Sequence, residues 1–306
     1  MVNEEKLPPL KIYQKKVWLE EYNKEPYKSI RQKVLDVFKD LVFIEEGHRY
    51  FVGDRELTSV SVMTHTFQEH FDPDVQAPLT YERNYDNPNS KYYHMSVEEI
   101  KKAWEDNSKR SCSHGTERHE FSESIFHFMV GEYDRILPEF KDRLKQDENG
   151  EYYFLAIKAK EIAAGKVYMD MPDCLIPILA ETKVYNIEKE YAYSGTFDIL
   201  FYYNAALNHK PLADSGLYVL DWKTNADLFK NFAGKTLLPP FDEMLDMPKS
   251  MYILQLNSYQ MALEKIGLKV IARKLFWLLP DGTYQKIPLE NITKKLNEAL
   301  KEKGIK

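Results

Sequence analysis

Two apolar runs in the second half of the chain, each carrying an aspartate, constrain its fold more than any other feature. Residues 217–224 read LYVLDWKT, and residues 193–201 read YSGTFDILF. Short runs that are rich in aliphatic and aromatic residues predict β-strands. Because side chains alternate between the two faces of a strand, we expect Asp221 and Lys223 on one face and Trp222 on the other.

If these two strands are neighbours, Asp198 of the first run joins Asp221 and Lys223 of the second. Two carboxylates and one ammonium would then converge, which suits a divalent cation, a phosphate group and an activated water. Mg²⁺ takes oxygen ligands, and the backbone carbonyl of Trp222 offers a third oxygen beside the two carboxylates. A cation held in this way can polarise a phosphate. The pattern therefore favours metal-dependent hydrolysis of phosphodiester bonds.

The overall charge of the chain, −6 over 306 residues, weighs mildly against a nucleic-acid substrate, because nucleic-acid-binding domains are usually basic. It does not exclude one, since a metal site concentrates acidic residues and a basic groove can coexist with an acidic total. The 21 tyrosines offer ring faces for unpaired bases. Most tyrosines in a globular protein are nevertheless half-buried packing residues.

Cys112 and Cys174 are the only cysteines, too few for a disulfide framework or a four-cysteine metal site. This usage favours a reducing compartment. No apolar run approaches the ~20 residues of a membrane span. The charged start of the chain also lacks the apolar core of a signal peptide. We therefore expect a cytoplasmic protein that has no membrane segment.

The periodicity of apolar residues predicts an α/β fold. Helical spacing is expected over 1–40, 96–108, 114–130, 136–166, 250–266 and 290–303, and strands over 41–44, 50–52, 58–62, 177–185, 193–201, 217–223 and 270–279. Residues 72–96 are expected to form a loop with a short helix, able to act as a flap. Residues 225–249 form a second long connection, and connections of this length are usually functional or disordered.

A histidine on the helix predicted over 114–130 is a further candidate. Thr116, His119 and Glu123 share one helix face, because steps of three and four residues bring side chains together. His119 could add a metal ligand, and an imidazole ligand shifts the preference toward Mn²⁺. The alternative is a solvated histidine on a helix surface. Glu181, on the strand before Asp198, could act through a second metal or a water.

Five motifs, in this order along the chain, resemble the PD-(D/E)XK nuclease superfamily, in particular its RecB-like exonuclease branch. They are Gly115-Thr116-Glu117-Arg118-His119, Glu181, Gly195-Thr196-Phe197-Asp198, Asp221-Trp222-Lys223-Thr224 and Gln255-Leu256-Asn257-Ser258-Tyr259. Within that branch the chain is similar to phage-encoded exonucleases and to the mitochondrial genome maintenance exonuclease. The resemblance spans about residues 114–285. It implies a mixed central β-sheet flanked by helices, a restriction-endonuclease-like core over 111–306, and an N-terminal α/β extension over 1–110.

The resemblance also implies roles for individual residues. His119, Asp198 and Asp221 would bind Mg²⁺ or Mn²⁺ with the carbonyl of Trp222, and Lys223 would be the catalytic lysine. Glu181 would be the extra acid of the branch, although Glu188 and Glu190 compete for this place. Gln255 and Tyr259 match a motif that supports the active site and the DNA strand, and Thr116 is assigned to DNA with them. Tyr259 also belongs to the apolar stripe of its helix.

These implications predict a DNA exonuclease that acts on single-stranded ends, with Tyr81, Tyr85, Tyr92 and Tyr93 available to stack on bases. The alternatives are a structure-specific or restriction-type endonuclease with the same site, and a non-catalytic DNA-binding protein. Some relatives carry four cysteines that bind an iron–sulfur cluster, so two cysteines predict none here. Replication or recombination proteins are expected partners, in phage DNA degradation, recombination or DNA repair.

Overall fold

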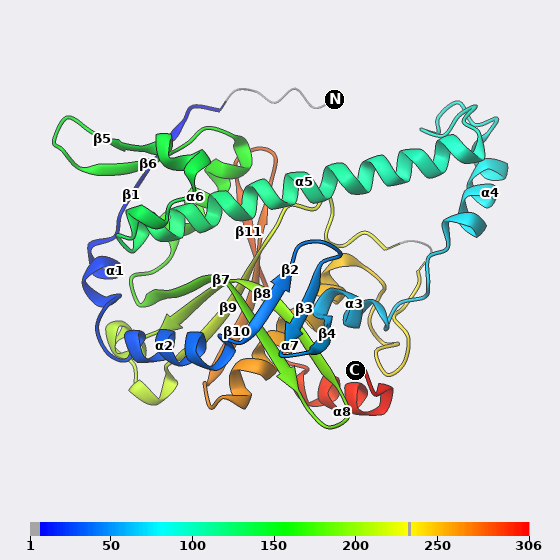
Figure 1. Cartoon of the computed structure of the whole chain (residues 1–306). Helices are drawn as coiled ribbons and strands as arrows, with labels where there is room; N and C mark the ends of the chain where they lie inside the picture. Colours follow the sequence, from blue (N-terminus) through cyan, green and yellow to red (C-terminus); the bar gives the residue numbers. More distant parts are fainter. Residues whose placement is uncertain (1–6, 232–233, 306) are drawn as a thin grey trace.

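The computed structural model describes residues 7–231 and 234–305, with the backbone alone described at 108 and 110–116. A mixed eight-stranded sheet, flanked by helices, forms the body of the protein, and a smaller three-stranded sheet lies at one end (Figure 1). The α/β architecture with a mixed central sheet is therefore confirmed.

The strands of the main sheet are β2 (Leu41–Ile44), β3 (Arg49–Val52), β4 (Arg55–Ser59), β7 (Leu175–Ile187), β8 (Ala192–Tyr203), β9 (Gly216–Lys223), β10 (Val270–Leu278) and β11 (Tyr284–Pro288). The small sheet consists of β1 (Leu10–Tyr13), β5 (Leu144–Gln146) and β6 (Tyr152–Ala156). The helices are α1 (Lys16–Glu21), α2 (Tyr27–Phe38), α3 (Val60–His65), α4 (Pro73–Asn84), α5 (Val97–Met129), α6 (Ala159–Asp170), α7 (Pro248–Lys265) and α8 (Thr293–Lys303).

The two strands that carry the predicted aspartates are neighbours in the main sheet. β8 and β9 are antiparallel, with Ile199 opposite Leu220, and β10 runs parallel to β9 on its other side. β7 pairs with β8 along most of its length. The acidic residues of three consecutive β-strands are therefore held on one rigid scaffold, as the sequence predicted for the second and third.

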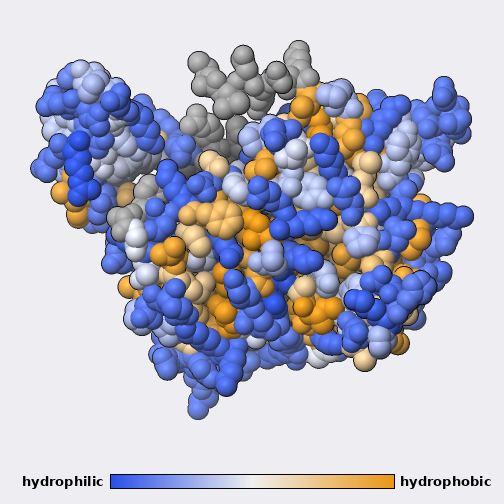
Figure 2. All heavy atoms as spheres, turned by 180° about the vertical axis from the view of Figure 1, so that it is seen from behind, coloured by the Kyte–Doolittle hydropathy of each residue, from blue (hydrophilic) through white to orange (hydrophobic). Residues whose placement is uncertain are grey.

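Helix α5 is one continuous helix of 33 residues, where two separate helices were predicted. Its start was predicted correctly, because Ser96 and Glu99 cap the first turn reciprocally. The separation was wrong, since Gly115 weakens a helix by only about 1 kcal/mol and long helices tolerate this. The N-terminal half of α5 projects from the body with α4 at its tip (Figure 1). Seen from behind, this arm is mostly hydrophilic, whereas hydrophobic patches gather on the body (Figure 2).

Three other predicted elements were wrong at least in part. Of the strand predicted over 58–62, residues 60–62 instead begin helix α3, because the side chain of Ser59 caps α3 by accepting a hydrogen bond from the Val62 amide. Residues 10–13 form a strand because they pair with β6, far along the chain. The region predicted as helix over 136–166, with a turn at 147–150, contains a 3₁₀ segment (Pro138–Arg143), the β5–β6 hairpin and the first eight residues of α6, so the turn is confirmed and the helix only from residue 159 onward.

The region predicted as a loop with a short helix over 72–96 contains the 12-residue helix α4, which Asp72 caps and Pro73 begins. The second half of the connection over 225–249 packs against the segment that follows α3. The Leu238 amide donates to the Phe67 carbonyl at 2.8 Å, and the ring of Phe241 packs edge-on against that of Phe67. This half of the connection is therefore held against the segment that leads from α3 to α4.

The predicted division at 110/111 falls inside α5. One hydrophobic cluster joins residues from both sides of it, such as Trp18 and Phe201, whose ring centroids are 5.6 Å apart. The division into an extension and a core stays a prediction from the sequence. Among the described helices, none combines the length and the apolar character that crossing a bilayer requires.

Candidate metal centre

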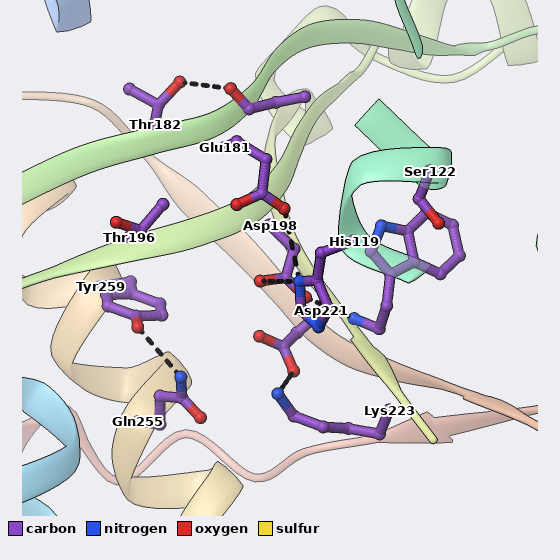
Figure 3. Close-up of polar contacts among 12 residues, drawn as sticks. His119, Ser122, Glu181, Thr182, Thr196, Asp198, Asp221, Lys223, Gln255 and Tyr259 are labelled. Atoms are coloured by element: carbon purple, nitrogen blue, oxygen red, sulfur yellow. Dashed lines mark hydrogen bonds and ion pairs between the residues drawn. The ribbon is translucent and has the colours of Figure 1, made fainter. Parts of the chain in front are cut away.

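Five polar side chains from four elements meet beside the β8–β9 pair (Figure 3). They are His119 of α5, Glu181 of β7, Asp198 of β8, and Asp221 and Lys223 of β9. Nδ1 of His119 lies 3.4 Å from Oε1 of Glu181 and 3.4 Å from Oδ1 of Asp198. One ligand atom from each of these three residues lies within 4.8 Å of the others, so the three could hold one metal ion together.

The position of His119 follows from how α5 is anchored. Two phenylalanines of α5, Phe121 and Phe128, pack against Phe154 of the small sheet, with ring centroids 5.6 Å apart in each case. The His119 side chain projects from another part of the helix surface and points toward the acids of β7 and β8. The alternative considered from the sequence, a solvated histidine on a helix surface, does not describe this side chain, which is 28% exposed and lies against two carboxylates.

Asp198 interrupts the ladder between β8 and β9. The two strands pair up to Ile199 and Leu220, and at the next position Oδ2 of Asp198 accepts a hydrogen bond from the Trp222 amide at 2.7 Å. Asp198 is therefore buried and fixed by the backbone of the neighbouring strand. The Trp222 ring points to the opposite face, as predicted, and packs against Phe276 at 5.3 Å.

Asp221 is buried and forms an ion pair with Lys223, whose side chain is 12% exposed, with Nζ 2.5 Å from Oδ2 of Asp221. Oδ1 of Asp221 is also buried, and among the described residues it has no hydrogen-bond partner. The Lys223 ammonium lies 4.3 Å from the ring centroid of Tyr252, a cation–π arrangement. A buried carboxylate oxygen without a donor is costly, and a bound cation would satisfy it.

Glu181 has a left-handed backbone conformation in the middle of β7, with φ of +42°. This conformation is unfavourable for a residue with a Cβ, and such strain is concentrated at functional sites. Of the three glutamates considered from the sequence, Glu181 is the one that reaches His119. Glu188 pairs instead with Lys265 at 2.7 Å, and Glu190 lies in the same turn between β7 and β8.

The site brings together three carboxylates, whereas only His119 and Lys223 can supply positive charge. Burial and the charge of Asp198 raise the pKa of Glu181 to about 7, although His119 acts to lower it. Burial and the charge of Asp198 also raise the pKa of Asp221 to about 7, although Lys223 acts to lower it. Burial also acts to raise the pKa of Asp198, but His119 and Lys223 outweigh it and lower this pKa. Burial acts to lower the pKa values of His119 and Lys223, but the carboxylates raise both. A divalent cation would relieve the excess of negative charge.

The residues present therefore fit a divalent cation. One imidazole nitrogen and several carboxylate oxygens are donors that Mn²⁺ and Mg²⁺ accept. The three residues with ligand atoms within 4.8 Å of one another are His119, Glu181 and Asp198, whereas the sequence predicted His119, Asp198 and Asp221 as ligands. Asp221 lies next to these three and forms the ion pair with Lys223. The carbonyl of Trp222 stays a predicted ligand, since the described contacts of Trp222 involve its amide and its ring.

The predicted Gln255 and Tyr259 lie together on α7 next to the site, where Nε2 of Gln255 donates to the Tyr259 hydroxyl at 3.0 Å (Figure 3). Burial raises the pKa of Tyr259, and the charges of Asp221 and Asp198 raise it further. The side chain of Thr116 lies outside the described residues. The sequence reading missed Tyr252, although its spacing of three and seven residues from Gln255 and Tyr259 places it on the same helix face.

No protein-family model matches the sequence, and a search of the curated proteins found no significant match. The case for a function therefore depends on the site itself and on the motifs that it contains.

Proposed function

We propose that this protein is a Mg²⁺- or Mn²⁺-dependent deoxyribonuclease that hydrolyses phosphodiester bonds as an exonuclease, from single-stranded ends. One observation carries the proposal: Lys223, whose side chain is 12% exposed, is paired with a buried aspartate directly beside a His–Glu–Asp cluster that could hold a metal ion. The order of these residues along the chain is also the order of motifs in the PD-(D/E)XK superfamily that the sequence resembles.

His119, Glu181, Asp198 and Asp221 would hold the cation between α5 and the three strands. When bound, the cation would polarise the scissile phosphate and lower the pKa of a coordinated water. The carboxylates of this site position the phosphate indirectly, because they fix the cation and repel any anion that approaches without it.

Lys223 acts as a cation rather than as a base. Its pKa is raised by Asp221 and Asp198 in spite of burial, so the ammonium keeps its proton near neutral pH. Asp221 and the ring of Tyr252 fix the ammonium in place. From this position Lys223 stabilises the negative charge that develops on the phosphate in the transition state, and a preorganised donor of this kind contributes roughly 10²–10³ in rate.

The aromatic residues of the arm favour a single-stranded DNA substrate. Its tip carries a cluster of aromatic residues in which Tyr85 packs on Tyr81 and on His94, with ring centroids 4.9 Å apart in each case. Tyr85 is 37% exposed and Tyr93 is 43% exposed, so part of this aromatic surface is open. Stacking of an unpaired base on an aromatic side chain contributes roughly 1–3 kcal/mol per base, and double-stranded DNA offers no such bases away from its ends.

The test is digestion of end-labelled single-stranded DNA with Mg²⁺ or Mn²⁺, compared with EDTA. We expect the wild type to shorten the strand from an end, and Lys223→Ala to slow this by roughly 10²–10³. Lys301→Ala is the matched control, because Lys301 is an exposed lysine on α8 at a distance from the site along the chain. The control should digest DNA at the rate of the wild type.

Covalently closed circular DNA distinguishes the alternatives. An exonuclease spares closed circles and degrades the same circles once they are linearised. If the wild type cuts closed circles, the endonuclease alternative replaces the proposal. If neither metal supports cutting of any DNA substrate, the protein is no deoxyribonuclease, and a DNA-binding role becomes the better account.

A further inference from the structure

A second site lies on the face of the main sheet that is turned away from the metal centre. A cavity of about 290 Å³ is lined there by residues that include Cys174, Tyr203, Tyr218, Lys274, Phe276 and Lys286. Alternation along β9 separates the two sites, because Tyr218 and Leu220 line the cavity whereas Asp221 and Lys223 belong to the metal centre. The cavity shares no lining residue with the metal centre.

The pairing of strands explains why two lysines face this cavity. Lys274 lies opposite Leu220 on β9, and Phe276 lies opposite Lys286 on β11, so all four side chains share one face of the sheet. Farther along this face α6 covers the sheet, where Tyr168 packs on Trp222 with centroids 5.6 Å apart. α6 ends at Asp170, and the cavity begins directly after it, at Met171.

The two lysines bring positive charge that the described residues do not neutralise. Neither ammonium forms an ion pair with a described carboxylate; the contacts recorded for them are with the rings of Tyr218, at 4.8 Å from Lys274, and of Tyr284, at 5.5 Å from Lys286. Burial lowers the pKa of Lys274, and the charge of Lys286 lowers it further. An anion between the two ammonium groups would be stabilised by both.

The walls of the cavity are suited to a flat apolar group. The rings of Tyr203 and Tyr218 are stacked, with centroids 5.9 Å apart and an angle of 25° between their planes. Phe276 and Cys174 are both buried. The volume is close to the lower end of small-molecule sites, roughly 300–1,000 Å³, so the cavity takes a small molecule and excludes a nucleic-acid chain.

We propose that this cavity binds a small aromatic anion, a ring that carries a phosphate or carboxylate, with the charge held by Lys274 and Lys286 and the ring against Tyr218 and Phe276. The proposal is independent of the nuclease function, because it uses no residue of the metal centre. Both a nucleoside monophosphate and a simple aryl anion contain a ring and an anionic group, and their relative affinities distinguish the two kinds of ligand.

The first test is isothermal titration calorimetry in EDTA, which prevents phosphate from binding at the metal centre through a cation. The probes are phenyl phosphate, thymidine 5′-monophosphate, inorganic phosphate and phenol. We expect one molecule of phenyl phosphate per chain, bound at least tenfold more tightly than phosphate or phenol alone. Lys274→Met and Lys286→Met should each weaken binding by tenfold or more, since hydrogen bonds to charged groups are among the stronger ones. Lys301→Met, the matched control, should bind as the wild type does.

Cys174 gives a second readout at the cavity itself. In a Cys112→Ser background, alkylation by iodoacetamide reports on Cys174 alone. Saturating phenyl phosphate should slow this alkylation at least fivefold, and in Lys274→Met the same concentration should give little protection. Tighter binding of thymidine 5′-monophosphate than of phenyl phosphate identifies a nucleotide site, and the reverse order identifies a site for a simple aryl anion.

The proposal is overturned if phenyl phosphate does not bind in the millimolar range, or if it binds to Lys274→Met and Lys286→Met as tightly as to the wild type. Equal affinity for phenyl phosphate and inorganic phosphate removes the aromatic part of the proposal. Binding without protection of Cys174 places the ligand elsewhere. Circular dichroism of each lysine variant establishes that a loss of binding is not a loss of fold.

Discussion

The ring of Tyr259 lies so close to Gly195 that a Cβ atom at position 195 would be 2.9 Å from Cε1 of the tyrosine. The hydroxyl of Tyr259 would be 3.1 Å away, and Cγ2 of Val60 also 3.1 Å. Gly195 thus permits α7 to approach β8 three residues before Asp198. The glycine of the Gly-Thr-X-Asp motif therefore has a packing role that is separate from the chemical role of the aspartate.

Gly195→Ala should destabilise the protein by about 1–3 kcal/mol, because the new methyl group overpacks the contact with Tyr259 and Val60. Urea unfolding measures the change. In a Tyr259→Leu background the same substitution should cost clearly less, since the leucine lacks the ring atoms at the contact. Tyr259→Phe keeps the ring and serves as the control, in which the cost stays that of the wild type. An equal cost in all three backgrounds would contradict this account.

Asp198 offers a way to separate its charge from its structural hydrogen bond. Asp198→Asn keeps an oxygen that can accept from the Trp222 amide, whereas Asp198→Ala leaves that buried amide without an acceptor. We expect the alanine variant to be less stable than the asparagine variant by about 1–3 kcal/mol. Both variants should lose metal-dependent activity, because both lack the carboxylate.

Thermal unfolding of the two Asp198 variants, with nuclease assays in parallel, checks this prediction. Asp227→Asn is a suitable control, because Asp227 accepts from the Phe229 amide in the exposed loop after β9 and is not part of the cluster. If Asp198→Asn and Asp198→Ala were equally stable, the hydrogen bond from Trp222 would contribute nothing to the fold.

Stability without metal should fall as pH rises from about 5 to 8. The pKa values of Glu181 and Asp221 are raised to about 7 in the folded protein, so the folded state binds more protons than the unfolded chain between the ordinary carboxyl pKa and 7. A cation requires the ionised forms, so Mn²⁺ should stabilise the protein more at pH 8 than at pH 6. At a concentration 100-fold above its Kd, it adds about 2.7 kcal/mol.

Melting temperatures in EDTA and in Mn²⁺, measured across this pH range, test the metal site without any assay of activity. Glu181→Gln should flatten the pH dependence in EDTA and weaken the effect of Mn²⁺. Glu188→Gln is the control, because Glu188 pairs with Lys265 away from the cluster. An effect of Mn²⁺ that is the same at pH 6 and pH 8 would count against these carboxylates as ligands.

The parts of the fold that the sequence predicted correctly are those determined by local periodicity. Alternation of side chains placed Asp221 and Lys223 on one face and Trp222 on the other, and the structure bears this out. The capping box at Ser96 and Glu99 is equally local. Each of these signals requires only residues within a few positions, so a single sequence contains it in full.

The parts that failed depend on partners far along the chain. Leu10 lies in a strand because it pairs with Ala156, and nothing near residue 10 indicates that partner. The hydrogen bond from the Trp222 amide to Asp198 was not predicted, because it forms only where β8 and β9 are neighbours. The left-handed backbone at Glu181 has no local signal either, since glutamate is not a residue that favours this conformation.

That backbone conformation leads to the last prediction. Glu181→Gly should be more stable than Glu181→Ala by about 1 kcal/mol, because glycine adopts a φ of +42° without the steric cost that a Cβ atom brings. Both variants remove the carboxylate, so their difference reports on the backbone alone. For comparison, Lys183→Gly should be less stable than Lys183→Ala, since Lys183 lies two residues farther along the same strand and has no left-handed conformation. Urea unfolding of the four variants gives both differences. If glycine were the less stable choice at both positions, the left-handed conformation of Glu181 would not be a feature of the folded protein, and its carboxylate would have to reach His119 in another way.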